Sequence, residues 1–387
     1  MIRQRKTPPT QLVRNASVID DLRNGIFDGD VSSMESKNSE AFRSPPIDTK
    51  GKLFDASERP ILCMALDSVR NECAVGGADH GIKIFEVSTG KQQRELFTTK
   101  FGHHEWVTCI TYLPDGRVVS GGMDSKLCLW ESRGAKCIDL TGHQGSISGI
   151  KASANGKAMV SASYDTTLRV WETSHGKELL ALRGHTGPIL DFTWNGSLCA
   201  SSSRDSTARL WDITTGQAIR VLKGHRGHVD CIDLVDDEAF SLVFTGAQDG
   251  SLRVWDLRVE SCICTMILHE GAAINCVEAS RPFSYGVVVC GADHSMHVCD
   301  PALGFRPRLR ITDHKDFPYS LHVRSDLIFS GGGNGDLLVH DINSGVCLYG
   351  LGANRAAVRC IGTTSSHLVC AGDDGSAMIY SYPYPAH

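Results

Sequence analysis

Four sets of polar residues in this chain have the types and order that nucleophilic catalysis uses. Each set holds a histidine, a hydroxyl residue, an aspartate and then a tryptophan. Histidine beside a hydroxyl and a carboxylate could activate the hydroxyl oxygen as a nucleophile. The sets are His103, Ser120, Asp124 and Trp130; His143, Ser161, Asp165 and Trp171; His185, Ser201, Asp205 and Trp211; and His225, Thr245, Asp249 and Trp255.

A hydrolytic site is expected once, in one pocket, whereas this pattern recurs four times in phase. The recurrence favours a structural interpretation. An aspartate in a tight turn can accept backbone N–H bonds, and a buried carboxylate must be paired to offset its desolvation. Histidine, hydroxyl and indole N–H groups supply the partners. We therefore predict four buried hydrogen-bond networks and no catalytic residues.

The sequence repeats with a period of a propeller blade. An aspartate or asparagine stands six residues before each large anchor, and successive anchors are 45, 41, 40, 44, 44, 41 and 40 residues apart. This spacing is typical of repeats that form one blade each. The eight anchors are Phe85, Trp130, Trp171, Trp211, Trp255, Cys299, His340 and Tyr380.

Each period contains four short β-type runs separated by turn residues. In the third copy the predicted strands are 147–150, 158–162, 168–171 and 178–182, with Asn155-Gly156 and His175-Gly176 between them. Four-stranded sheets in series can bury both faces by radial closure, which leaves short, protected edges. The pattern predicts an all-β, closed β-propeller of about eight four-stranded blades.

The repeats resemble the WD-repeat family. Gly102-His103, Gly142-His143, Gly184-His185 and Gly224-His225 open four repeats, and Trp211-Asp212 and Trp255-Asp256 close two of them. Trp130-Glu131 and Trp171-Glu172 are near matches, and the resemblance covers about residues 60–382. It implies a propeller in which the histidine, hydroxyl, aspartate and tryptophan positions form a network within each blade.

The two ends of the chain are predicted to share the last blade. The last repeat supplies three strands, around 358–361, 368–371 and 377–380, and then ends in Pro383-Tyr384-Pro385. Lys52-Leu53-Phe54-Asp55 is the candidate for the missing outer strand. The alternative is seven closed blades with one terminal repeat outside the ring. We assign residues 51–387 to the propeller and 1–50 to a tail that is extended or disordered when free.

The family resemblance also implies a docking surface at the top of the ring. The matching positions flank the first aliphatic residue of each inner strand or precede the turn aspartate. Trp, Tyr and Arg are enriched at binding hot spots. The alternative is that these side chains only cover the seams between blades. The predicted partner-binding residues are Trp106, Tyr164, Leu190, Arg204, His228, Phe317, Tyr319 and Arg359, called the rim residues below.

A second motif resembles the one by which some WD proteins join cullin-RING ubiquitin ligases. It runs from Asp249 through Trp255-Asp256-Leu257-Arg258, and Arg258 would be the residue that faces the ligase. The same letters also occur as ordinary strand ends.

Composition and charge argue against other classes of partner, although they do not exclude a local basic patch. The net charge is -5 and the sequence pI is about 6.3, which predicts no nucleic-acid or membrane partner. The histidines are spread one per repeat and Gly331 to Gly335 lacks a following Lys-Ser/Thr, so we expect no metal and no cofactor.

Fifteen cysteines without a secretion signal indicate a reduced protein. We expect it in the cytoplasm, or alternatively in the cilium and cytoskeleton or the nucleus.

Together these features predict a non-catalytic scaffold or adaptor for protein–protein interaction within a multiprotein complex. One alternative is a substrate receptor of a cullin-RING ubiquitin ligase. Another is a structural component of a ciliary or axonemal complex, on fold-level analogy alone.

Overall fold

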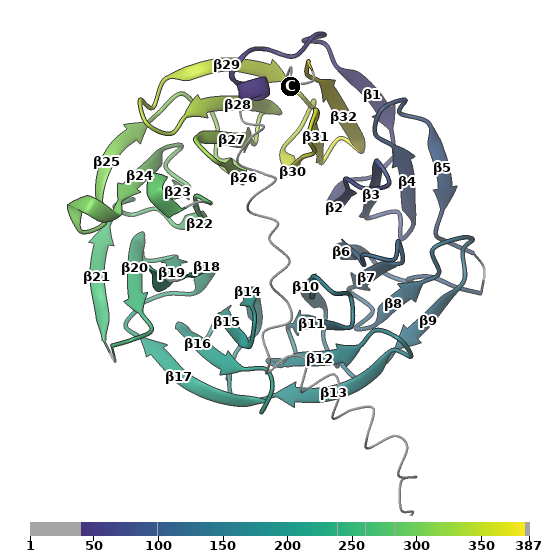
Figure 1. Ribbon diagram of the computed structural model, residues 1–387, viewed down its shortest axis with the longest axis horizontal. Helices are drawn as coiled ribbons and strands as arrows, with labels where there is room; N and C mark the ends of the chain where they lie inside the picture. The colour runs from purple at the N-terminus through teal and green to yellow at the C-terminus, as the bar shows by residue number, and fades with distance from the viewer. Residues whose placement is uncertain (1–39, 99, 238, 260, 282, 384–387) are drawn as a thin grey trace, which may run out of the picture.

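A computed structural model describes residues 40–383, except 99, 238, 260 and 282. Eight four-stranded antiparallel sheets stand around a ring, each a blade built mainly from one sequence repeat (Figure 1). The predicted closed propeller of eight blades is confirmed, and the alternative of seven does not occur. Apart from three 3-10 turns, the described residues contain no helix, and none of these turns is long enough to cross a bilayer.

The first four complete blades are each formed from four successive strands, ordered from the centre of the ring outward. Their bounds are β2 Ile61–Asp67, β3 Glu72–Gly77, β4 Ile82–Glu86 and β5 Gln92–Glu95; β6 Val107–Tyr112, β7 Val118–Gly122, β8 Leu127–Trp130 and β9 Cys137–Leu140; β10 Ile147–Ala152, β11 Ala158–Ser163, β12 Leu168–Glu172 and β13 Lys177–Leu182; and β14 Ile189–Asn195, β15 Leu198–Ser203, β16 Thr207–Asp212 and β17 Gln217–Lys223.

The remaining blades follow the same order, and the eighth also takes strand β1 from the start of the propeller. Their bounds are β18 Val229–Asp236, β19 Ser241–Ala247, β20 Ser251–Asp256 and β21 Cys262–Ile267; β22 Ile274–Ala279, β23 Val287–Gly291, β24 Met296–Asp300 and β25 Arg306–Ile311; β26 Pro318–Arg324, β27 Leu327–Gly332, β28 Asp336–Asp341 and β29 Cys347–Gly352; and β30 Val358–Thr363, β31 His367–Gly372, β32 Ser376–Ser381 and β1 Lys52–Asp55. The 3-10 turns are η1 Glu40–Arg43, η2 Phe283–Tyr285 and η3 Pro301–Leu303.

The ring closes as the sequence predicts. Strand β1 pairs antiparallel with β32, with Lys52 opposite Ile379 and Asp55 opposite Ser376. Both strands lie at the same point of the circumference although they come from opposite ends of the propeller (Figure 1). Closure removes the exposed edge that a three-stranded last blade would present.

Residues upstream of β1 also contact the ring. Phe42 in η1 is fully buried, with its ring 4.5 Å from that of Tyr382 and 5.8 Å from that of Phe329. Tyr349 donates its hydroxyl to the carbonyl of Phe42 at 2.7 Å. These contacts latch residues 40–43 onto blades 7 and 8. The predicted division at residue 50 stays a prediction, and residues 1–39 of the predicted tail lie outside the described part.

Small polar groups join neighbouring blades near the centre of the ring. The thiol of Cys63 lies 3.5 Å from the carbonyl oxygen of Val107 in the next blade, and Cys360 lies 3.6 Å from that of Leu62 across the closure. Ser320 donates to Val358 in the same way at 2.8 Å. The repeated cysteine positions are therefore seam contacts, and free cysteine fits there as a small buried residue.

Candidate protein-binding face

The four polar sets come together as networks within blades 2 to 5. In blade 3, His143 lies 2.7 Å from Asp165 through Nδ1 and 2.8 Å from Ser161 through Nε2. Trp171 donates its indole N–H to the same Ser161 oxygen at 2.8 Å. The structure brings the other twelve members together in the same pattern: His103, Ser120, Asp124 and Trp130; His185, Ser201, Asp205 and Trp211; and His225, Thr245, Asp249 and Trp255.

This geometry matches a catalytic triad but leaves no access to the hydroxyl. Ser120, Ser161, Ser201 and Thr245 are all fully buried. A carbonyl carbon must approach the hydroxyl oxygen for attack. In each of these blades the tryptophan donates its indole N–H to that oxygen. The four sets therefore link strands through hydrogen bonds, and their buried hydroxyls cannot act as nucleophiles.

Backbone donors and hydroxyls stabilise the charged form of the network aspartates. Burial alone would raise the pKa of Asp249, but hydrogen bonds from Ser251 and from the N–H of Arg226 outweigh it and lower the pKa to about 2. Asp165 and Asp205 also have lowered pKa values, where histidine and threonine partners outweigh burial. These carboxylates are ionised at neutral pH and hold the turn between the second and third strands of each blade.

One repeated backbone bond places the predicted rim on a single face. The residue before the turn aspartate donates its N–H to the carbonyl of the residue just before the inner strand, at 2.8–3.0 Å. Both loops therefore meet on the same side of every blade. The pairs are Ala78–Pro60, Met123–Trp106, Tyr164–Ser146, Arg204–Pro188, Gln248–His228, Ala292–Ala273, Gly333–Phe317 and Asp373–Ala357.

A β-bulge in each inner strand presents further side chains beside these loops. The register shifts by one residue after the first paired position, as between Ile189 and Asp191 in blade 4. A bulge leaves its extra residue unpaired and redirects the side chain. Leu190, Tyr319 and Arg359 are such residues. The bulge is the local reason why this second strand position belongs to the rim.

The rim exposes large apolar side chains. Trp106 is 41% exposed, Tyr164 42%, and Phe317 and Tyr319 are each 38% exposed. Met123, beside Trp106, is 41% exposed. Aromatic side chains with open faces provide binding area at low entropic cost.

Two groups of these side chains form clusters on opposite parts of the ring, in blades 3 and 4 and in blades 7 and 8, while Trp106 and Met123 lie on blade 2 next to the first. In blades 3 and 4 the guanidinium of Arg204 lies over the ring of Tyr164 at 5.5 Å. In blades 7 and 8 Arg359 lies over Tyr319 at 4.6 Å and also pairs with Asp373. Phe317 joins this second cluster, with its ring 6.2 Å from that of Tyr319. Cation–π contacts hold these side chains in defined positions.

Two predicted rim residues add less exposed side-chain surface to this face. Leu190 lies on blade 4 beside the first cluster, His228 lies on the neighbouring blade 5, and both are half-buried. Arg258 lies away from the rim, after the end of β20, at the opposite end of the strand from the turn aspartate. Its guanidinium is exposed but paired with Asp256 through two hydrogen bonds of 3.0 and 2.9 Å.

The sequence reading missed networks in the irregular repeats. His269 and Asp293 lie 2.7 Å apart in blade 6, and His314 and Ser330 lie 2.7 Å apart in blade 7. His269 is preceded by leucine instead of glycine, which hid the motif. The histidine-to-aspartate spacing of 24 residues, as in His225 and Asp249, is the signal that could have revealed it.

Comparison with known proteins agrees with this architecture. The model of the WD domain, G-beta repeat matches residues 94–131, 134–172, 176–212 and 216–256. A p21-activated protein kinase-interacting protein 1-like of Danio rerio is 22% identical over 59% of this chain and 60% of its own length. Telomerase protein component 1 of Rattus norvegicus is 29% identical over 34% of this chain and 5% of its own length. The chain thus spans 60% or less of the length of each of these two relatives.

Solved structures share the fold at low identity. Sqt1 from Chaetomium thermophilum has a TM-score of 0.76 and 16% identity, covering 86% of this chain and 99% of its own. The designed protein Ika8 has a TM-score of 0.74 and 23% identity, covering 84% of this chain and 97% of its own. The chain is therefore an eight-bladed β-propeller that carries four repeats matching the WD domain, G-beta repeat between residues 94 and 256.

Proposed function

We propose that this protein is a non-catalytic scaffold that docks a partner protein on the rim face, within a larger assembly. WD40 propellers mediate protein–protein interactions in general. The observation that carries the proposal is the gathering of Trp106, Tyr164, Phe317 and Tyr319 on one face, each more than a third exposed. A protein partner would bury these side chains.

The division of the rim into two clusters suggests how a partner would lie. A chain terminus or loop that crosses the ring can contact both clusters, with the half-buried Leu190 and His228 beside its path. Sqt1 of Chaetomium thermophilum has been solved bound to the N-terminus of ribosomal protein L10, with a TM-score of 0.74 to this chain. A propeller of this shape can therefore hold the terminus of another protein. The partner that we propose for this chain need not be the same protein.

Affinity purification with mass spectrometry tests the proposal. We expect the wild type to recover a defined set of proteins that a Trp106→Ala, Tyr164→Ala, Arg204→Ala variant loses. A second variant, Phe317→Ala with Tyr319→Ala, tests the other cluster. The matched control changes three exposed aliphatic residues outside the rim, Ile138, Ile219 and Leu303, to alanine. Retention of every partner by both rim variants would contradict docking on this face.

The ubiquitin-ligase receptor remains the alternative proposal. It predicts ligase recovery that depends on Arg258, so Arg258→Ala should abolish ligase capture and leave rim-dependent partners in place. The exposed guanidinium supports it, while the pairing with Asp256 means that a ligase would have to compete for that group. A cytoplasmic location, with the cilium or nucleus as alternatives, is likewise a proposal, which imaging of the tagged full-length chain tests.

A further inference from the structure

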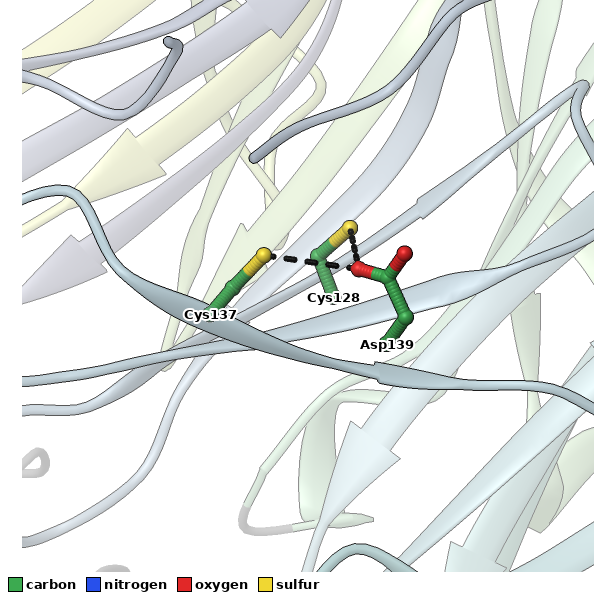
Figure 2. Close-up of side chains that lie close together, drawn as sticks. All are labelled: Cys128, Cys137 and Asp139. Carbon is green, nitrogen blue, oxygen red and sulfur yellow. Dashed lines mark hydrogen bonds between the residues drawn. The ribbon is translucent and has the colours of Figure 1, made fainter. Parts of the chain in front are cut away.

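Two cysteines and an aspartate converge on the outer part of blade 2. Cys128 lies on β8, and Cys137 and Asp139 lie on β9. The two sulfur atoms point at one carboxylate oxygen, Oδ1 of Asp139, from 3.6 and 3.5 Å (Figure 2). All three potential ligand atoms lie within 4.8 Å of one another.

The strand register explains this convergence. Cys128 is opposite Asp139, and Trp130 is opposite Cys137, with no irregularity between them. The corresponding strand pairs of blades 1 and 3 to 7 each contain a register shift at this point. Side chains alternate between the faces of a strand. The uninterrupted register therefore carries both cysteines and the aspartate to one face.

We propose that Cys128, Cys137 and Asp139 bind a zinc ion. Zinc prefers thiolate, imidazole and carboxylate ligands in tetrahedral geometry, with Zn–S about 2.3 Å and Zn–O about 2.0 Å. Those bond lengths place a sulfur and an oxygen about 3.5 Å apart in a tetrahedron. The observed separations of 3.6 and 3.5 Å already match. Cys137 is half-buried and Asp139 exposed, so water can reach the site as fourth ligand.

Lys126 completes the surroundings of the site. Its ammonium lies 2.9 Å from Oδ2 of Asp139, the oxygen that the thiols leave free. Groups that hold a ligating carboxylate in place strengthen metal binding. A divalent cation and the Lys126 ammonium together balance the charges of two thiolates and one carboxylate.

Blade 2 differs from blades 3 to 5 at Lys126 and Cys128 together, whereas the cysteine at the position of Cys137 also occurs in blades 5 and 7, as Cys262 and Cys347. Where blade 2 has Lys126, blades 3 to 5 have a hydroxyl residue bonded to the turn aspartate: Thr167, Thr207 and Ser251. Where it has Cys128, they have Arg169, Arg209 and Arg253. In blade 3 this arginine pairs with Glu178, which stands in the place of Cys137. The pair that sets blade 2 apart is Cys128 opposite Asp139, where blades 3 to 5 have Arg169–Ala181, Arg209–Val221 and Arg253–Thr265.

The sequence alone did not predict this site. Cys137 and Asp139 lie nine and eleven residues after Cys128, and no second cysteine pair stands at zinc spacing. The expectation of no metal rested on the dispersed histidines. The β8–β9 hairpin supplies the proximity that the linear spacing conceals.

Zinc titration of the reduced, chelator-treated full-length chain tests the proposal, with a chromogenic chelator as competitor. We expect one tightly bound ion per chain, and affinity at least about tenfold weaker in Cys137→Ser and in Asp139→Asn. Both substituted residues lie on the outer strand with access to solvent, so these variants should fold. Bound Co²⁺ should give sulfur-to-metal charge-transfer absorption that is weaker in Cys137→Ser, which keeps one thiolate ligand, and Ca²⁺ should not compete because it prefers oxygen ligands.

Two controls locate the ion. The variant Cys262→Ser with Cys264→Ser removes the close cysteine pair of blade 5 and should bind zinc like the wild type. Cys347→Ser removes one member of the other metal-sized cluster among the described residues, Asp313, His340 and Cys347, and should also bind normally. Equal affinity in the wild type and Cys137→Ser, or loss of binding in either control instead, would overturn the proposal. So would recovery of Cys128 and Cys137 only as a disulfide under reducing conditions.

Discussion

Nε2 of His340 lies 3.1 Å from Oδ2 of Asp313, and this pair replaces a tryptophan and a glycine. In blades 3 and 4 the glycine of the Gly-His motif lies against the tryptophan, where an added Cβ would come within 3.2 Å of Cη2 of Trp171 or Trp211. Histidine is smaller than tryptophan and leaves room for the Asp313 side chain. In the seventh repeat, aspartate in place of glycine thus compensates for histidine in place of tryptophan, and the blade keeps its architecture.

Restoring both standard residues should restore the standard network. We expect His340→Trp alone to lower the free energy of unfolding by about 1 to 3 kcal/mol, because the indole would collide with Asp313. Asp313→Gly alone should also destabilise, since it removes a partner of a fully buried ring. The double variant should regain at least the wild-type stability because Ser330 is in place to accept the indole N–H, as Ser161 does.

Urea unfolding of the four proteins forms a double-mutant cycle. A favourable coupling between the two substitutions supports the compensated exchange. Strictly additive losses would show that the glycine and tryptophan positions are independent in this blade.

The turn aspartates should contribute strongly to stability. Asp165→Ala removes the acceptor for the N–H of Gln144 and leaves the buried ring of His143 without its carboxylate partner. We expect a loss of about 1 to 3 kcal/mol in the free energy of unfolding. Thermal melts check this, with the exposed Glu131→Ala as control. A melting temperature equal to wild type would remove Asp165 from any structural network.

Much of the fold follows from spacing that is visible in the sequence. The anchors from Phe85 to Tyr380 repeat at blade distance, and the third-copy strands predicted at 147–150 and 178–182 occur as β10 and β13 with ends moved by one or two residues. The closing strand was predictable because a blade with three strands leaves unpaired backbone groups.

Side-chain relationships across the repeats were less accessible. Cys128 and Asp139 meet through strand register, and periodicity does not specify where a bulge is missing. Asp313 reaches His340 from the loop between β25 and β26. The burial of Phe42 could not be predicted because its partners, such as Phe329, come from the far end of the chain. Residues that depart from the repeat pattern, such as Asp313 and Cys128, therefore form contacts that the regular repeats lack.

Buried neutral histidines should make the protein lose stability in mild acid. Burial and the neighbouring His269 lower the pKa of His297 to about 4, and burial with His340 lowers that of His314 to about 4. In the unfolded chain a histidine pKa is about 6.5. Between these values the unfolded state binds protons that the folded state does not, so the free energy of unfolding falls as pH falls from about 6.5 to about 4.

Urea midpoints measured from pH 7 to pH 4.5 check this dependence. His297→Gln should reduce the slope of stability against pH, whatever it does to stability at pH 7. His175→Gln, at an exposed turn, is the control and should leave the slope unchanged. A wild-type slope that survives replacement of both His297 and His314 would mean that other groups cause the loss.

The latch formed by Phe42 should stabilise the seam between blades 7 and 8. Its ring is fully buried against Phe329 and Tyr382, and the guanidinium of Arg324 lies 5.3 Å from its centre. We expect Phe42→Ala to lower the free energy of unfolding by about 3 kcal/mol, because truncation leaves a cavity lined by aromatic side chains. Urea unfolding measures the loss, and Ile47→Ala, at a residue 74% exposed, is the control. Equal midpoints for Phe42→Ala and wild type would show that residues 40–43 lie on the ring without supporting its closure.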